Sequence, residues 1–242
     1  MTEAAILAAI AFLGALIFGI TGFGAALVTI PLATHLVSLK FALALFVLAD
    51  LAAALSVGLE NPRNAVRAEW TRLVPMILAG TALGVTLLVN LPRETGMLLL
   101  GLFVVWFGIF NLTRRSSERV VSSRWAWLAG LAGGITSTVF GAGGPPYAIY
   151  LSQRGLTKEQ FRATMGFATL ASISLRAVAF TLTGLLLDAD VWLKALAVVP
   201  ACLAGIWVAR RIYLRISRDA LMRAVALLLL VSGASLISRA VL

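Results

Sequence analysis

The sequence predicts an all-α integral membrane protein made of two inverted repeats, each a broken-helix hairpin followed by three transmembrane helices. Three observations lead to this prediction: the composition, a glycine-rich motif that occurs twice, and the distribution of basic residues. Of the 242 residues, 61% are hydrophobic and 12% are charged, whereas soluble domains average roughly 45–50% apolar and about 25% charged residues. The mean hydropathy is +1.00. This composition excludes an ordinary soluble domain.

Uncharged runs mark the expected membrane segments. The run 4–39 has 36 residues and would measure about 54 Å as one helix, too long for a hydrocarbon core of about 30 Å. It must therefore break or fold back, and the same holds for the run 125–153. Residues 1–3 carry no basic segment, so we expect the first run to be a membrane segment and not a signal peptide. The other charge-poor runs are expected to cross once: 41–59, 73–92, 95–113, 163–187, 191–209 and 220–238.

Each of the two long runs contains a glycine-rich segment, TGFGAAL at 21–27 and VFGAGGPP at 139–146. Lipid offers no partner to freed backbone N–H and C=O groups, so a break at membrane depth is stable only inside protein or beside a water-filled cavity. The glycines are therefore expected to form the bends of two hairpins. Pro145 and Pro146 suit the first turn of the helix that follows the second bend. Close packing between helices is the alternative role of such glycines.

The chain also resembles itself. Residues 23–25 (FGA) fall on 140–142 at an offset of 117, and the later segment 91–94 falls on 216–219 at an offset of 125. At this second offset Pro75 falls on Pro200, Gly80 on Gly205 and Gly108 on Gly233. An ordered set of matches along the whole chain favours duplication. The predicted organisation is a first membrane repeat at 1–113, a cytoplasmic linker at 114–124 and a second membrane repeat at 125–242.

The basic residues predict the orientation. If each long run is a hairpin and every other run crosses once, one face holds 14 basic residues, at 63–72, 114–124, 154–162 and 210–218, and the other holds 4. If the long runs cross once, the two faces hold 9 each. The positive-inside rule favours the hairpins. Both termini are then non-cytoplasmic, and an odd number of crossings per half inverts the second repeat. The net charge of +10 is thus assigned to cytoplasmic loops, and no nucleic-acid partner is expected.

The segments 19–31 (GITGFGAALVTIP) and 140–146 (FGAGGPP) resemble the glycine-rich motif of the TauE/SafE family of sulfite exporters. The resemblance extends over the whole chain through length, repeat and spans. It implies export of small sulfur oxyanions or organosulfonates across the bacterial inner membrane, without a cofactor. The chain departs from the family pattern at Ala25 and Ala26, which replace glycines, and where Tyr147 directly follows the two prolines.

Two charges in the middle of predicted spans are candidates for the transport chemistry. Arg176 lies near mid-depth, where an arginine costs about 2.5–3.5 kcal/mol on insertion scales, and its planar guanidinium suits sulfite, a sulfonate or a carboxylate. Pairing with Asp50 or with helix carbonyls, or snorkelling to the interface, are the alternatives. Asp50 is the only acid in any apolar run, and we expect it to couple transport to an ion by taking up a proton. A fixed partner for Arg176 or a helix cap is the alternative.

The remaining substrate-binding candidates are the glycines of the two bends and nearby hydroxyl groups. Hydroxyl groups of Ser and Thr in membrane helices usually bond to their own backbone, so Thr21, Thr29 and Tyr150 are weaker candidates. His35, the only histidine, is expected at the surface and not in a metal site. Together with Arg176, the substrate-binding candidates are Gly22, Gly24, Thr138, Gly141, Gly143, Gly144 and Tyr147.

The sequence therefore predicts a secondary transporter for a small anionic substrate, embedded in membrane lipid. A transporter for a carboxylate or a metal ion is the alternative. An enzyme is not expected, because one His and the single Cys202 leave little with which to build an active site. The choice of anion, the direction of transport, the coupling ion, the formation of a homodimer and the pairing of Asp50 with Arg176 stay open.

Overall fold

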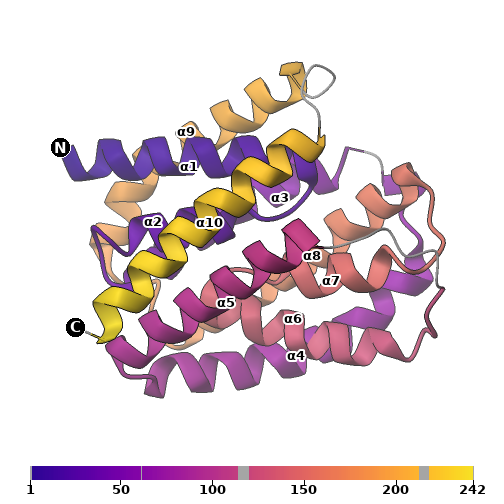
Figure 1. The fold of residues 1–242 in the computed structure, drawn as a ribbon, viewed down its shortest axis with the longest axis horizontal. Helices are drawn as coiled ribbons and strands as arrows, with labels where there is room; N and C mark the ends of the chain where they lie inside the picture. The colour runs from indigo at the N-terminus through magenta and orange to yellow at the C-terminus, as the bar shows by residue number, and fades with distance from the viewer. Residues whose placement is uncertain (1, 61, 114–119, 213–217, 242) are drawn as a thin grey trace.

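The structure is a computed structural model that describes residues 2–60, 62–113, 120–212 and 218–241. Regular structure in these ranges is entirely helical (Figure 1). Six helices there are long and apolar enough to cross a membrane, so the predicted all-α membrane fold is confirmed. The elements are α1 (Thr2–Thr21), α2 (Ala25–Ala33), α3 (Leu39–Gly58), the 3-10 turn η1 (Pro62–Asn64), α4 (Arg67–Asn90), α5 (Arg93–Thr113), α6 (Trp125–Phe140), α7 (Gly144–Leu151), α8 (Lys158–Leu182), α9 (Ala189–Ile212) and α10 (Arg218–Val241).

Both long uncharged runs break at their glycines, as predicted. α1 ends at Thr21, and the chain turns through Gly22 and Gly24, whose φ angles are 81° and 92°. α6 ends at Phe140, and Gly141, which caps it, has a φ of 73°. Only glycine adopts these left-handed angles without steric cost. The short helix α2 then runs back alongside α1 (Figure 1), and α7 follows the second bend in the same way.

The long helices pack in three main pairs: α1 with α9, α4 with α6, and α5 with α10. Glycine allows two of these pairs to approach closely. A Cβ added at Gly80 would lie 2.3 Å from the carbonyl oxygen of Leu131, and one at Gly205 would lie 2.5 Å from that of Phe12. Without a hydrophobic force between helices in lipid, close backbone packing is a main source of their association. Gly80 and Gly205, matched in the sequence comparison, thus have the same packing role.

The helices of each half pack chiefly on helices of the other half. α1 of the first half lies on α9 of the second, and α6 of the second lies on α4 of the first, while α3 and α8 contact each other in the centre. Neither half therefore covers its own apolar faces. Helix order is also the same in both halves, with one long helix, one short helix and three long helices. The inversion of the repeats stays a prediction.

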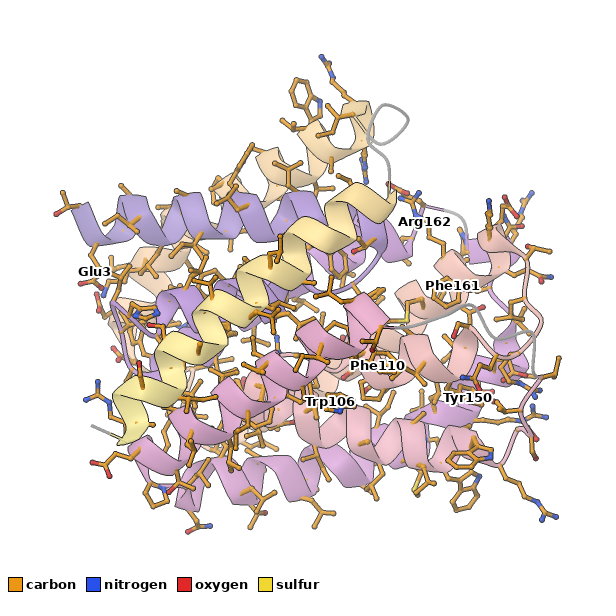
Figure 2. The ribbon with its side chains drawn as sticks, viewed as in Figure 1. Glu3, Trp106, Phe110, Tyr150, Phe161 and Arg162 are labelled. Atoms are coloured by element: carbon orange, nitrogen blue, oxygen red, sulfur yellow. The ribbon has the colours of Figure 1, made fainter. Side chains whose placement is uncertain are left out.

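The two ends of the bundle can be identified from the termini and from labelled side chains. Both termini lie at one end (Figure 1), which also carries Glu3, whereas Arg162 lies at the other end (Figure 2). The backbone N–H of Val121 bonds to Gln153, so the segment before α6 and the loop after α7 meet at the Arg162 end. This arrangement matches the hairpin topology. Which end faces the cytoplasm stays a prediction.

Cysteine labelling tests the topology. In a Cys202→Ala background, Ser123→Cys and Glu159→Cys should react with an impermeant thiol reagent only from the cytoplasmic side. Leu187→Cys, in the exposed loop before α9, should react only from the opposite side. The readout is the sidedness of labelling in intact cells and in inverted vesicles. Labelling of Ser123→Cys and Glu159→Cys from opposite sides would contradict the hairpin model.

Candidate functional site

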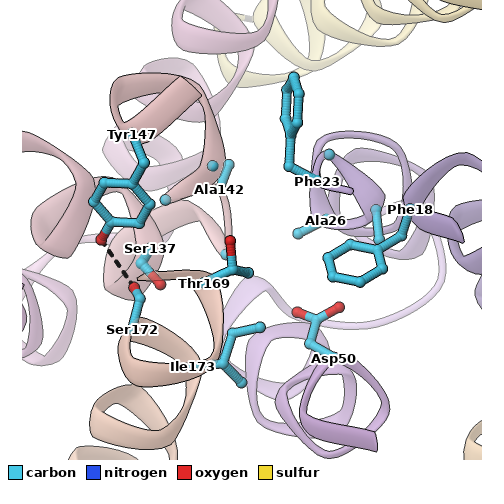
Figure 3. A pocket seen from close by; sticks show the side chains of 15 residues that line it. Phe18, Phe23, Ala26, Asp50, Ser137, Ala142, Tyr147, Thr169, Ser172 and Ile173 are labelled. Carbon is cyan, nitrogen blue, oxygen red and sulfur yellow. Dashed lines mark hydrogen bonds between the residues drawn. The ribbon is translucent and has the colours of Figure 1, made fainter. Parts of the chain in front are cut away.

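The two glycine bends meet at one pocket in the middle of the bundle (Figure 3). Its volume of about 30 Å³ accommodates one or two water molecules, since a water needs roughly 10–15 Å³. A sulfonate does not fit in this space. The lining residues are Phe18, Phe23, Gly24, Ala25 and Ala26 from the first hairpin, Asp50 from α3, Ser137, Gly141, Ala142, Gly143, Gly144 and Tyr147 from the second hairpin, and Thr169, Ser172 and Ile173 from α8.

A buried ion pair joins three helices beside this pocket. The Arg176 side chain is fully buried, and its Nη2 donates to Asp50 Oδ2 at 2.6 Å. Nη1 donates to the backbone carbonyl of Ser137 at 2.9 Å. That carbonyl belongs to the last turn of α6, where backbone acceptors lack partners within the helix and the dipole favours a cation. The pairing with Asp50 that the sequence left open is therefore present in this state.

Arg176 does not itself line the pocket. Its guanidinium lies behind Gly141, where an added Cβ would be 3.1 Å from Nη1. Two polar atoms of the site have no hydrogen-bond partner in the protein, the Nε of Arg176 and the Oγ1 of Thr169. Buried polar groups are nearly always paired, so these two atoms call for a ligand, a water or a rearrangement.

The predicted glycines have both of the roles that the sequence left open. Gly24, Gly141, Gly143 and Gly144 line the pocket, whereas Gly22 does not. The three glycines of the second bend are also tightly packed: a Cβ added at Gly144 would lie 2.8 Å from the Cβ of Phe23 in the other bend. The two bends therefore touch each other as well as the cavity.

The two helices that start at the pocket, α2 and α7, differ in the number of free backbone N–H groups in their first turns. Neither α2 nor α7 has a side-chain cap at its N-terminus, so backbone N–H groups there have no partner within the helix. α2 begins with Ala25 and Ala26, which both supply an N–H group. α7 has Pro145 and Pro146 in its first turn, and proline has no N–H group. The first hairpin is thus the richer source of donors for an anion.

Hydroxyl groups of α7 and α8 form one wall of the pocket. Tyr147 is fully buried with its ring against Gly133, and its hydroxyl donates to Ser172 Oγ at 3.0 Å (Figure 3). Thr138, a predicted ligand, donates instead to the carbonyl of Gly134 in its own helix and does not line the pocket. Sequence reasoning missed Thr169 and Ser172. Their spacing from Arg176, seven and four residues, places all three on one helix face, and this pattern was available in the sequence.

A second buried charge cluster lies near the Arg162 end of the bundle. Glu69, at the start of α4, accepts from the Tyr150 hydroxyl at 2.5 Å and from Arg154 Nη2 at 2.9 Å. Arg154 also donates to the carbonyl of Val121. Hydrogen bonding to Glu69 raises the pKa of the Arg154 guanidinium, which therefore stays charged. The cluster fixes the end of α7 to α4, and the Tyr150 hydroxyl bonds to Glu69 and does not line the pocket.

His35, as expected, is exposed.

An all-helical bundle with six potential spans and two broken hairpins that meet at a central pocket belongs to the class of membrane transporters. The chain belongs to the sulfite exporter TauE/SafE family, whose model matches residues 7–236. It is also similar to the probable inner membrane transporter protein TsaS of Comamonas testosteroni, with 25% identity over 193 residues, or 79% of this chain and 81% of that protein. No solved structure matches the chain. The family resemblance drawn from the glycine-rich motifs is thereby confirmed.

The ion pair makes a prediction about stability. Arg176→Ala leaves the Asp50 carboxylate buried without a counter-charge, which should lower the free energy of unfolding by about 3–5 kcal/mol. Asp50→Ala should have a comparable effect, and the double variant should recover most of the loss. Thermal unfolding in detergent measures all four proteins. Additive losses in the double variant would show that the pair makes no net contribution to stability.

The Gly141 bend allows a matched comparison. Gly141→Ala places a methyl group 2.9 Å from Ala26 Cβ and 3.1 Å from Arg176 Nη1, at a φ of 73°. Gly155 has a similar φ of 66°, and an added Cβ there would make only an ordinary contact, 4.0 Å from Val120 Cγ2, so Gly155→Ala isolates the backbone strain. Gly141→Ala should be less stable than Gly155→Ala by about 1–3 kcal/mol because of this crowding. Equal losses of stability would mean that the bend is not tightly packed.

Proposed function

We propose that the protein is a secondary transporter that exports small sulfur-containing anions, sulfite or organosulfonates, across the bacterial inner membrane by alternating access. The observation that carries the proposal is the meeting of both glycine bends at one closed pocket beside a buried guanidinium. Family membership and the similarity to a probable inner membrane transporter support it. In this topology both termini are non-cytoplasmic.

The substrate anion competes with Asp50 for Arg176. A sulfonate or sulfite presents oxygens that accept from the same guanidinium fork as a carboxylate. Its charge replaces that of Asp50 on Nη2, and the Nε without a partner provides a second donor. The hydroxyl of Thr169 and the N–H groups at the start of α2 complete the site. Thus Arg176 binds the anion, and the bends surround it.

Asp50 is the ion-coupling group in this scheme. A carboxylate released from Arg176 in a low-dielectric interior has no counter-charge and takes up a proton or another cation. The anion and the cation therefore bind together, and the site is neutral both empty and occupied. The combined gradients of the two then set the direction of net movement.

Transport into proteoliposomes tests this function, with sulfite, methanesulfonate, sulfate and acetate as probes. The wild type should move sulfite or methanesulfonate saturably and more readily than acetate. Arg176→Lys keeps the charge but loses the planar fork, and it should weaken binding about tenfold. Arg124→Lys, at the exposed start of α6, is the matched control and should behave as the wild type. Full transport by the double variant Asp50→Ala with Arg176→Ala would exclude Arg176 as the ligand.

A further inference from the structure

A second pocket opens at the end of the bundle opposite the termini, where α3 ends and α8 begins. Its volume is about 400 Å³, and it is lined by Val57, Glu60, Asn64, Lys158, Glu159, Arg162 and Ala163. Lys158 is exposed and Arg162 is half-buried, so the pocket faces the solvent at the end of the bundle that Arg162 marks in Figure 2. We call this pocket the Glu60 vestibule. Unlike the central pocket, it is large enough for a small organic anion.

The vestibule and the central pocket lie along the same two helices. On α3, Val57 lines the vestibule and Asp50 lines the central pocket, and seven residues of helix correspond to about 10 Å. On α8, Ala163 and Thr169 line the two pockets in the same order, about 9 Å apart along the helix. The contact between α3 and α8 is therefore the direct route from the vestibule to the central site.

Two glycines close this route. A Cβ added at Gly166 would lie 3.0 Å from the Cα of Gly58, and one at Gly58 would lie 3.3 Å from the carbonyl oxygen of Gly166. The helix backbones touch each other at this point, with no side chain between them. Rotation of a side chain cannot open such a contact. Opening requires α3 and α8 to separate.

Glu60 holds the helices together at the mouth of the route. Its Oε2 accepts from Arg162 of α8 at 3.2 Å, and its Oε1 accepts from Arg210 of α9 at 2.7 Å. Arg210 also donates to the carbonyl of Ser56 in α3 at 2.8 Å. The three charged side chains retain 27–46% of their solvent exposure, and ion pairs this exposed contribute only about 0–1 kcal/mol each. Another anion can therefore exchange with this carboxylate at little cost.

We propose that the Glu60 vestibule is the site at which the anionic substrate first binds, and that the substrate replaces the Glu60 carboxylate on Arg162 and Arg210. A sulfonate or sulfite fits this exchange because its oxygens match the guanidinium fork that a carboxylate uses. Lys158 adds a positive charge at the rim, where the neighbouring Glu159 carboxylate offsets it, so the two arginines carry the attraction for the anion. Loss of the Glu60 contacts weakens the connection of α8 to α3 and α9, which raises the population of states in which the contact between Gly58 and Gly166 is open. This inference rests on the proposed transport of sulfur-containing anions.

Transport kinetics from the vestibule side test the binding step, with sulfite and methanesulfonate as probes in oriented vesicles. Arg162→Gln should raise KM about tenfold, because one charge-assisted contact is lost. Glu60→Gln should lower KM, because it removes the internal competitor. Arg211→Gln is the matched control, because it removes the same charge from the residue that follows Arg210. The Arg211 guanidinium does not contact Glu60 and lies 3.8 Å from the Trp207 ring centroid. An unchanged KM for Arg162→Gln, or an equal rise for Arg211→Gln, would overturn the proposal.

The opening of the route can be measured by cysteine alkylation, which does not depend on the identity of the substrate. Ala53 is buried on α3 between Asp50 and Val57, so Ala53→Cys in a Cys202→Ala background reports access along the route. Glu60→Gln should speed its alkylation from the vestibule side about threefold, the population shift expected when an exposed ion pair is lost. Added methanesulfonate should do the same in the otherwise wild-type chain. If neither change affects labelling, the gate is wrong even if transport occurs. If both speed labelling but no sulfur anion is transported, the proposed opening of the route is supported and the proposed substrate is wrong.

Discussion

The arrangement of the bundle depends on how a guanidinium is satisfied in the middle of a membrane protein. Arg176 is buried where water cannot solvate it, so its donors must find oxygen atoms on other helices. It finds a carboxylate on α3 and a carbonyl at the end of α6. The carbonyl is free only because α6 breaks at Gly141, and the break is tolerated only because protein encloses it. The ion pair and the broken helix therefore stabilise each other.

The same interdependence makes the small central pocket compatible with the proposed transport site. The ion pair occupies the guanidinium when no substrate is present, which avoids leaving a buried charge without a partner. The remaining space holds only a water or two. In the proposed mechanism a substrate competes with a group that the protein itself supplies, and this competition links occupancy of the site to the positions of α3, α6 and α8. In the proposed vestibule, Glu60 and its two arginines undergo the same kind of exchange at the surface, where exposure makes it easier.

The sequence predicts the features that depend on local chemistry. The length of the uncharged runs and the glycines within them located both helix breaks, and the basic residues grouped the loops that lie at the Arg162 end of the bundle. The sequence could not show that Arg176 lies behind Gly141, because that depends on how helices distant in sequence pack. The Glu69 cluster was missed because Glu69 lies at a helix start, outside the apolar runs in which a charge is conspicuous. Thr169 and Ser172 were predictable, since they share a face of α8 with Arg176.

The central charges lie where the two halves differ. Asp50 aligns with Phe167 at the offset of 117 and with Leu175 at 125, while Arg176 aligns with Leu59 or Leu51. A faithful duplication would place two carboxylates or two guanidiniums near one pocket, and like charges in a low-dielectric interior repel strongly. A single acid from α3 of the first half and a single base from α8 of the second give a neutral pair. The repeated glycines thus form a common scaffold, and the departures from the repeat supply its chemistry.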